Sequence, residues 1–111
     1  MFDRLRSEEQ FAYVTTTGRK TGLQRQIEIW FVEYEGEIYI LAEHGLRAQW
    51  VKNIMANPQV YVRIGESEWT GTARALDPEK DMEAYVKVRE LSRQKFGWGD
   101  GMPVEIKRKP R

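Results

Sequence analysis

The chain has 111 residues, a formal net charge of +1, one histidine and no cysteine. This length predicts one domain with only a modest pocket of its own. The small net charge gives no general attraction to nucleic acid or to an anionic membrane, so neither is expected as a partner. Disulfides and thiolate metal sites are excluded, and a histidine-rich metal site is impossible. We therefore expect no bound metal.

Residues 1–10 are too polar to belong to a core and are expected to form an N-terminal arm. They contain no apolar stretch suited to a signal peptide or a membrane-spanning helix. We therefore expect no stable membrane insertion, and a cytoplasmic location fits the absence of cysteine. Residues 11–111 are expected to form the single domain.

Six runs rich in aromatic and β-branched residues predict strands joined mostly by turns. They cover residues 11–16, 27–34, 38–42, 59–64, 68–76 and 102–107. Apolar residues occupy both faces of the second run, with Ile29 on one face and Trp30 on the other, which predicts burial on both faces. In the fifth run Trp69 alternates with Gly71 and Ala73. Small residues on one face predict the close approach of another backbone or of a ring.

Two segments predict helices. A short helix over residues 49–56 is stopped by Asn57 and Pro58. Asp77 as N-cap and Pro78 in the first turn predict the start of a longer helix that runs to about Lys95. The apolar face of this longer helix would consist of Met82, Tyr85, Val86, Val88 and Leu91. These elements together predict a mainly β (α+β) fold, a small six-stranded antiparallel barrel with one short and one long helix.

The connection between the first two strands is rich in positive charge and glycine. It reads Thr17-Gly18-Arg19-Lys20-Thr21-Gly22, with Arg25 shortly after. Glycines let the backbone turn so that several N–H groups can face one concavity. Arginine supplies a planar fork that matches phosphate, and lysine supplies a compact point charge. The pattern indicates an anion site, and the alternative is a solvated basic turn.

A second motif, Trp-x-x-Asn-x-x-Ala-Asn-Pro-x-Val, follows over residues 50–60. The two motifs in this order resemble the deazaflavin-dependent nitroreductase family, and the resemblance extends from about Phe11 to about Val104. That family is similar in fold to the wider flavin-binding split-barrel proteins. The resemblance therefore implies that the barrel is a split β-barrel.

The resemblance also implies a cofactor, coenzyme F-420, a 5-deazaflavin whose tail carries a phosphodiester and a polyglutamate. Arg19, Lys20 and Arg25 match family positions that bind this anionic tail, and Asn53 matches the helix asparagine of the second motif. Ile29 and Trp30 would lie along the deazaflavin ring. The residues implied to bind the cofactor are Gly18, Arg19, Lys20, Thr21, Gly22, Arg25, Ile29, Trp30 and Asn53.

The activity implied by the resemblance is hydride transfer from reduced F-420 to a small electron-poor acceptor, such as a nitroaromatic, a quinone or an enone. Three alternatives stay open: the same barrel using FMN, a non-enzymatic carrier of a flavin or deazaflavin, and an interaction module without a cofactor. No catalytic dyad or triad can be assembled from the sequence, so the reactive group is expected to belong to the cofactor. His44, at the end of the third strand, could orient the acceptor or donate a proton, or be merely an exposed loop histidine.

The sequence departs from the family pattern at several places, among them a loop from Gly45 to Trp50 and an N-terminal arm that are shorter than in many relatives. Gln24 and Glu28 stand where many relatives have proline, which affects the rigidity of the basic loop and the acceptor side of the site. Trp30, Trp69 and Trp98 are more large aromatic residues than the interior of a small barrel needs. Because interfaces favour aromatic residues at their buried centre, this excess predicts a homodimer.

Overall fold

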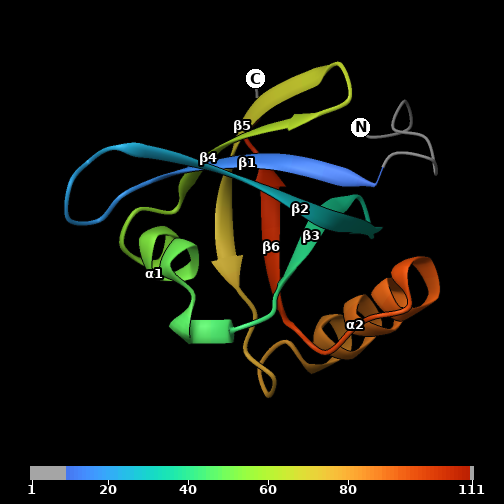
Figure 1. Ribbon diagram of the computed structural model, residues 1–111. Coiled ribbons are helices and arrows are strands. Elements are labelled where there is room, and N and C mark those ends of the chain that lie inside the picture. The colour runs from blue at the N-terminus through green and yellow to red at the C-terminus, as the bar shows by residue number, and fades with distance from the viewer. Residues whose placement is uncertain (1–9, 111) are drawn as a thin grey trace.

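The computed structural model describes residues 10–110. The expected N-terminal arm lies outside this range except for its last residue, Gln10. Within the described range, six antiparallel strands close into a barrel in the order β1-β2-β3-β6-β5-β4 (Figure 1). This arrangement, with two α-helices, confirms the predicted fold class.

The strands lie close to the predicted ranges. They are β1 (Phe11–Thr17), β2 (Gln24–Tyr34), β3 (Glu37–Ala42), β4 (Gln59–Ile64), β5 (Ser67–Ala75) and β6 (Met102–Arg108). Between β3 and β4 lie a short 3-10 helix, η1 (Gly45–Arg47), and the helix α1 (Gln49–Ala56). The longer helix, α2 (Met82–Phe96), connects β5 to β6. In the described part of the chain, neither α-helix is long and apolar enough to cross a membrane.

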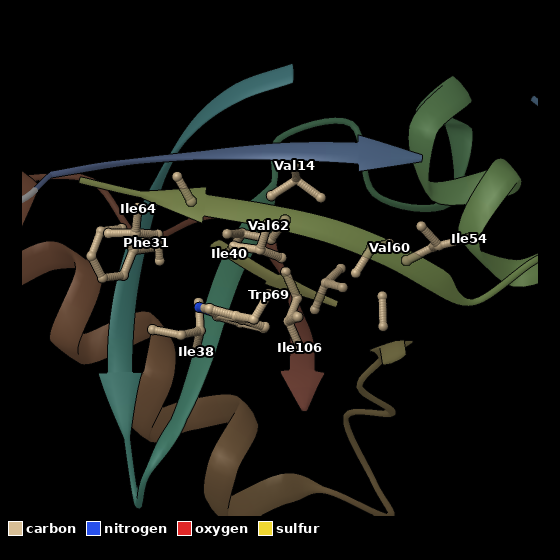
Figure 2. Packing of buried hydrophobic residues seen from close by; sticks show 13 residues of the cluster. Val14, Phe31, Ile38, Ile40, Ile54, Val60, Val62, Ile64, Trp69 and Ile106 are labelled. Atoms are coloured by element: carbon tan, nitrogen blue, oxygen red, sulfur yellow. The ribbon is translucent and has the colours of Figure 1, made fainter. Parts of the chain in front are cut away.

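The interior of the barrel is filled by inward-facing side chains from all six strands. Trp69 of β5 lies among aliphatic residues that include Ile38 and Ile106, and Ile54 reaches this core from α1 (Figure 2). A six-stranded barrel has little internal space, and one tryptophan occupies much of it. Trp69 is only 6% exposed, so it is a core residue and gives no support to the argument for an interface.

Strand β2 contributes to two separate cores, as its two-faced pattern predicts. Ile27, Ile29 and Phe31 face the barrel core, and Ile27 and Ile29 are only partly buried. Val32 and Tyr34 face a second cluster, which α2 closes with Val88 and its neighbours. The helix α2 therefore covers the outer face of β2 only near the C-terminal end of that strand.

The starts of two elements differ from prediction. β2 begins at Gln24 instead of Ile27, because the polar segment 24–26 continues the pairing with β1. α2 begins at Met82, with Asp81 as its N-cap residue. Asp77 instead closes a separate turn, where its carboxylate accepts the N–H groups of Glu79 at 2.8 Å and Lys80 at 3.0 Å. These two hydrogen bonds lower the pKa of Asp77.

The predicted apolar face of α2 is wrong at two positions. Met82 and Val86 are 64% and 59% exposed, whereas Val88 is fully buried. Tyr85 and Leu91 are partly buried against the second cluster, as expected. The side of the helix that packs against the second cluster follows Ala84, Tyr85, Val88 and Leu91. Met82 and Val86, four residues apart, share a neighbouring side that is exposed.

The small residues of β5 do mark a close approach. A Cβ atom on Gly71 would lie 2.7 Å from the carbonyl oxygen of Lys107 on β6 and 3.1 Å from the Trp69 ring. Both distances are shorter than ordinary van der Waals contact, and the nearer atom belongs to a paired backbone that cannot easily move. Gly71 therefore allows β5 to pair with β6 while Trp69 fills the interior.

We expect Gly71→Ala to lower the free energy of unfolding by about 1–3 kcal/mol, because overpacking a tight site forces the backbone to shift. The melting temperature should fall by roughly 4 °C or more. Thr72→Ala, at an exposed position next in the same strand, is the matched control and should change stability by less than about 0.5 kcal/mol. Urea unfolding followed by circular dichroism measures both. Equal stabilities of the two variants would contradict the packing role of Gly71.

Candidate functional site

The basic loop between β1 and β2 is a compact turn. The N–H of Gly18 donates to the carbonyl oxygen of Leu23 at 2.7 Å, and the N–H of Gly22 donates to that of Gly18 at 2.9 Å. The Thr21 hydroxyl accepts the N–H of Leu23 at 3.1 Å. Gly22 has φ +75°, a conformation that glycine adopts without strain. The loop is therefore fixed by its own hydrogen bonds.

These bonds narrow one expectation about the loop, that several of its N–H groups face an anion. The N–H groups of Gly18, Arg19, Gly22 and Leu23 all donate to atoms of the protein itself. They do not form a backbone cradle for an anion. A backbone contribution to an anion site in this loop is thus confined to the N–H groups of Lys20 and Thr21, beside the side chains that the loop presents.

Arg19 fastens the loop to α1. Its backbone N–H and its Nη1 both donate to Oδ1 of Asn53, at 3.2 Å and 2.8 Å. Its Nη2 donates to Oε1 of Gln49 at 3.0 Å. Asn53 is 7% exposed, so the loop is held by a buried amide from the helix. Figure 1 shows the β1–β2 loop and α1 on the same side of the barrel.

The loop, the start of β2 and α1 enclose a cavity of about 380 Å³. Among the described residues of its lining, Arg19, Lys20 and Arg25 are charged and none is a carboxylate. None of the ion pairs found within residues 10–110 involves these three cations. We call this hollow the cationic cavity. Its full lining is Gly18, Arg19, Lys20, Thr21, Arg25, Ile27, Gln49, Trp50 and Asn53.

A second, mostly aromatic and aliphatic cavity of about 580 Å³ lies further along β2. We call it the apolar cavity. Residues of β2, the loop after β3, α1 and the C-terminal end of α2 contribute to it. Its lining comprises Phe11, Glu28, Ile29, Trp30, Phe31, Val32, Leu41, Glu43, His44, Ala48, Trp50, Ser92, Phe96 and Trp98.

The two cavities are neighbours. Trp50 lines both of them, and β2 lines the cationic cavity with Arg25 and Ile27 and the apolar cavity from Glu28 onward. The partly buried Ile27 and Ile29 are two residues apart, so their side chains lie on the same face of this strand. The site is therefore a trough along β2, with a cationic end and an apolar end.

An aromatic stack forms one wall of the apolar cavity. Trp30 of β2 and Phe96, the last residue of α2, lie parallel with ring centroids 4.5 Å apart. Lys95 donates from Nζ to the carbonyl oxygen of Phe31 at 3.1 Å, which ties the end of α2 to the middle of β2. Trp30 is 37% exposed, so much of its surface is still available for contact with another group.

Polar groups are few in the apolar cavity. The exposed His44 lies at the start of η1, and its side chain makes no capping hydrogen bond. Glu28 accepts a hydrogen bond from the Tyr13 hydroxyl at 2.8 Å, which raises the pKa of Tyr13. Within residues 10–110, no group of three or more His, Asp or Glu side chains could hold a metal ion.

The family model for F420H(2)-dependent quinone reductases matches residues 4–100 of the chain. The chain belongs to this family. It is therefore an oxidoreductase whose cofactor is the deazaflavin coenzyme F-420, as the sequence motifs implied, and the FMN alternative loses support. The reduction that it catalyses depends on F-420.

Solved structures agree with this family and fold. A structure of an F420-H2-dependent reductase, FDR-A, is 26% identical, covers 88% of this chain and 93% of its own, and superposes with a TM-score of 0.67. A structure described as a domain-swapped dimer is 28% identical over 88% of this chain and 79% of its own, with a TM-score of 0.62. The heme storage protein HutZ from Vibrio cholerae is 18% identical, covers 99% and 89%, and has a TM-score of 0.78, which shows the shared fold alone.

The structure places the predicted site residues in two groups. Gly18, Arg19, Lys20, Thr21, Arg25 and Asn53 line the cationic cavity, and Ile29, Trp30 and His44 line the apolar cavity. Gly22 lines neither cavity and serves the turn. The donors of the cationic cavity suit a tail that carries several negative charges, because none of its three cations forms an ion pair with a carboxylate among residues 10–110.

Sequence reasoning missed several residues of the trough. Phe96 and Trp98 reach the apolar cavity from the end of α2, and Phe11 reaches it from the start of β1. Gln49 binds Arg19 although it precedes the second motif by one residue. The only available signal for Gln49 was its spacing of four residues from Asn53 on the predicted helix, which puts the two side chains on one face.

Proposed function

We propose that this F-420-dependent oxidoreductase holds the anionic cofactor tail in the cationic cavity and reduces a planar, neutral, electron-poor acceptor, a quinone above all, in the apolar cavity. Nitroaromatics and enones share the required chemistry. The observation that carries the proposal is the continuity of the trough, in which Trp50 borders a cavity with three cations and a cavity walled by aromatic rings. The apolar cavity has a size typical of sites for small molecules.

The bound cofactor supplies the two-electron donor, a hydride on reduced F-420. The protein then contributes alignment and the exclusion of water. Trp30 and Phe96 offer flat apolar surfaces against which a planar ring can pack. His44 offers a nitrogen at the edge of the cavity that can donate a proton or a hydrogen bond to an acceptor oxygen. Rate is gained mainly by holding two planar partners close and aligned.

We expect Lys20→Ala to weaken F-420 binding by about 1.5–3 kcal/mol, roughly ten- to a hundredfold in Kd, because a charge-assisted hydrogen bond is lost. Its stability should change by less than about 0.5 kcal/mol, since Lys20 is exposed. Arg19→Ala should weaken binding similarly and also cost about 1 kcal/mol of stability, because it leaves Asn53 with one hydrogen bond fewer.

Fluorescence titration with F-420 at two salt concentrations measures these effects, and the losses should shrink as salt rises. Lys107→Ala, which removes the same charge from an exposed position on β6, is the matched control. Binding curves for Lys20→Ala and Arg19→Ala that coincide with those of the control would show that the loop is only a solvated turn.

We expect His44→Ala to slow the oxidation of reduced F-420 by a quinone about tenfold, or about 1.4 kcal/mol, with the cofactor Kd unchanged. A side chain that only orients the acceptor or assists its protonation is not indispensable. Leu46→Ala, at an exposed neighbour that does not line the cavity, is the control. Complete loss of turnover in His44→Ala would make this histidine the essential acid. Failure of quinones, nitroaromatics and enones alike to oxidise the cofactor would contradict the proposed acceptor class.

We propose in addition that the protein forms a homodimer through the outer face of β1 and β2, so that the partner completes the open side of the apolar cavity. Phe11 and Trp30, which line this cavity, are register partners there and are 40% and 37% exposed. The similar structure described as a domain-swapped dimer supports self-association in this fold. Light scattering should give twice the monomer mass, and Phe11→Ser should shift the equilibrium towards monomer. Met82→Ser, at an exposed position on α2, should not. A monomer mass for the unaltered protein would refute this assembly.

A further inference from the structure

We propose that Gln49, acting with Asn53, is a positioning residue that aims the Arg19 guanidinium at the bound anion without neutralising its charge. This inference rests on the proposed function, because it concerns how the cationic cavity recognises the F-420 tail. It adds a residue and a physical role that the motifs of the sequence do not assign. It also changes the role of Asn53 from a direct ligand to a support for Arg19.

The geometry fixes Arg19 at three points. Asn53 Oδ1 accepts both the backbone N–H and Nη1 of Arg19, and Gln49 Oε1 accepts Nη2. Gln49 and Asn53 are four residues apart on α1, so their side chains lie on one face of the helix. A long, flexible side chain is thereby held at its base and at both terminal nitrogens. Less conformational entropy is then lost when an anion binds.

The chemistry of the two supports is as important as their geometry. Amide oxygens accept hydrogen bonds but carry no net charge. Arg74 provides a contrast within the same molecule, since it is held by Asp81 at 3.0 Å and by Glu105 at 3.5 Å. The charge of Arg74 is thus balanced inside the protein, whereas that of Arg19 is not balanced by any carboxylate among residues 10–110. Arg19 keeps its full attraction for a phosphate or carboxylate ligand.

Two of the five N–H donors of the Arg19 guanidinium are used by Gln49 and Asn53. The remaining donors have no partner among the described side chains and belong to a residue that lines the cationic cavity. The same amides therefore orient the fork and leave donors for an anion. A carboxylate at position 49 would hold Arg19 more tightly but would cancel the charge that the ligand needs.

The test compares Gln49→Met with Gln49→Glu by titrating F-420. Gln49→Met removes the acceptor at similar volume, and we expect about threefold weaker binding because Arg19 is no longer fixed. Gln49→Glu is nearly isosteric and strengthens the hold on Arg19, yet we expect about tenfold weaker binding from the added negative charge. The loss in Gln49→Glu should shrink with rising salt, and the loss in Gln49→Met should not.

Gln59→Glu is the matched control for charge, since Gln59 is exposed on β4 and does not line the cationic cavity. A double-mutant cycle tests whether Gln49 acts through Arg19. In the Arg19→Ala background, Gln49→Met should cause no further loss of affinity. Melting temperatures of the single variants verify that each protein is folded.

The outcomes separate this inference from the proposed function. If Arg19→Ala weakens binding but both Gln49 variants bind like the unaltered protein, Gln49 only tethers the loop to α1 and the inference is overturned. Additive losses in the double-mutant cycle would overturn it as well. If Arg19→Ala itself binds F-420 as tightly as the unaltered protein, the proposed cofactor site is wrong, and the inference that rests on it is overturned with it. The inference is supported if the unaltered protein binds F-420 most tightly, Gln49→Met less tightly and Gln49→Glu least tightly. The double-mutant cycle must also show that the effect of Gln49→Met depends on Arg19.

Discussion

Strand β2 has apolar side chains on both faces, and the rest of the molecule covers only its C-terminal half. Phe31 and Val32 are buried between the barrel core and the cluster under α2, whereas no residue from Gln24 to Trp30 is buried. Uncovered apolar surface of this kind usually marks a binding site. Both cavities border the uncovered N-terminal part of the strand, from Arg25 to Trp30. The trough therefore lies where the coverage by α2 ends.

The packing of the barrel explains why the site is on its outside. Trp69 and a set of isoleucines and valines fill the interior, and Gly71 is needed to bring β6 against them. A ligand cannot share that space, so it must bind between a strand and the segments beside it. The helix α1 is suited to this position because Ile54 anchors it in the core while Gln49 and Asn53 face the basic loop. One short helix thus connects the stability of the barrel to the geometry of the cationic cavity.

Much of this arrangement could be predicted from the sequence, and the errors have physical causes. Alternation of apolar residues located the strands, but the polar segment 24–26 was missed because hairpin pairing with β1 extends β2 without any apolar signal. Asp77 and Asp81 can each start a helix, and only the structure shows that Asp77 closes its own turn while Asp81 precedes α2. The loop cations were predicted from a motif of contiguous residues. Phe96, Trp98 and Gln49 were missed because distant parts of the chain bring them to the trough.

The polar groups of the site, among the residues that the structure describes, mostly fix one another. The loop uses the N–H groups of Gly18, Gly22 and Leu23 for its own turn, Arg19 is held by two amides, and Lys95 ties α2 to β2. Such an arrangement provides little reactive chemistry but a great deal of preorganisation. This is the division of work expected when the cofactor carries the two-electron donor, because the protein then needs only to place two planar molecules side by side. With the cofactor placed as we propose, rigidity at the cationic end would serve that purpose, since a cofactor anchored there by its tail would present its ring to the apolar end in a limited range of positions.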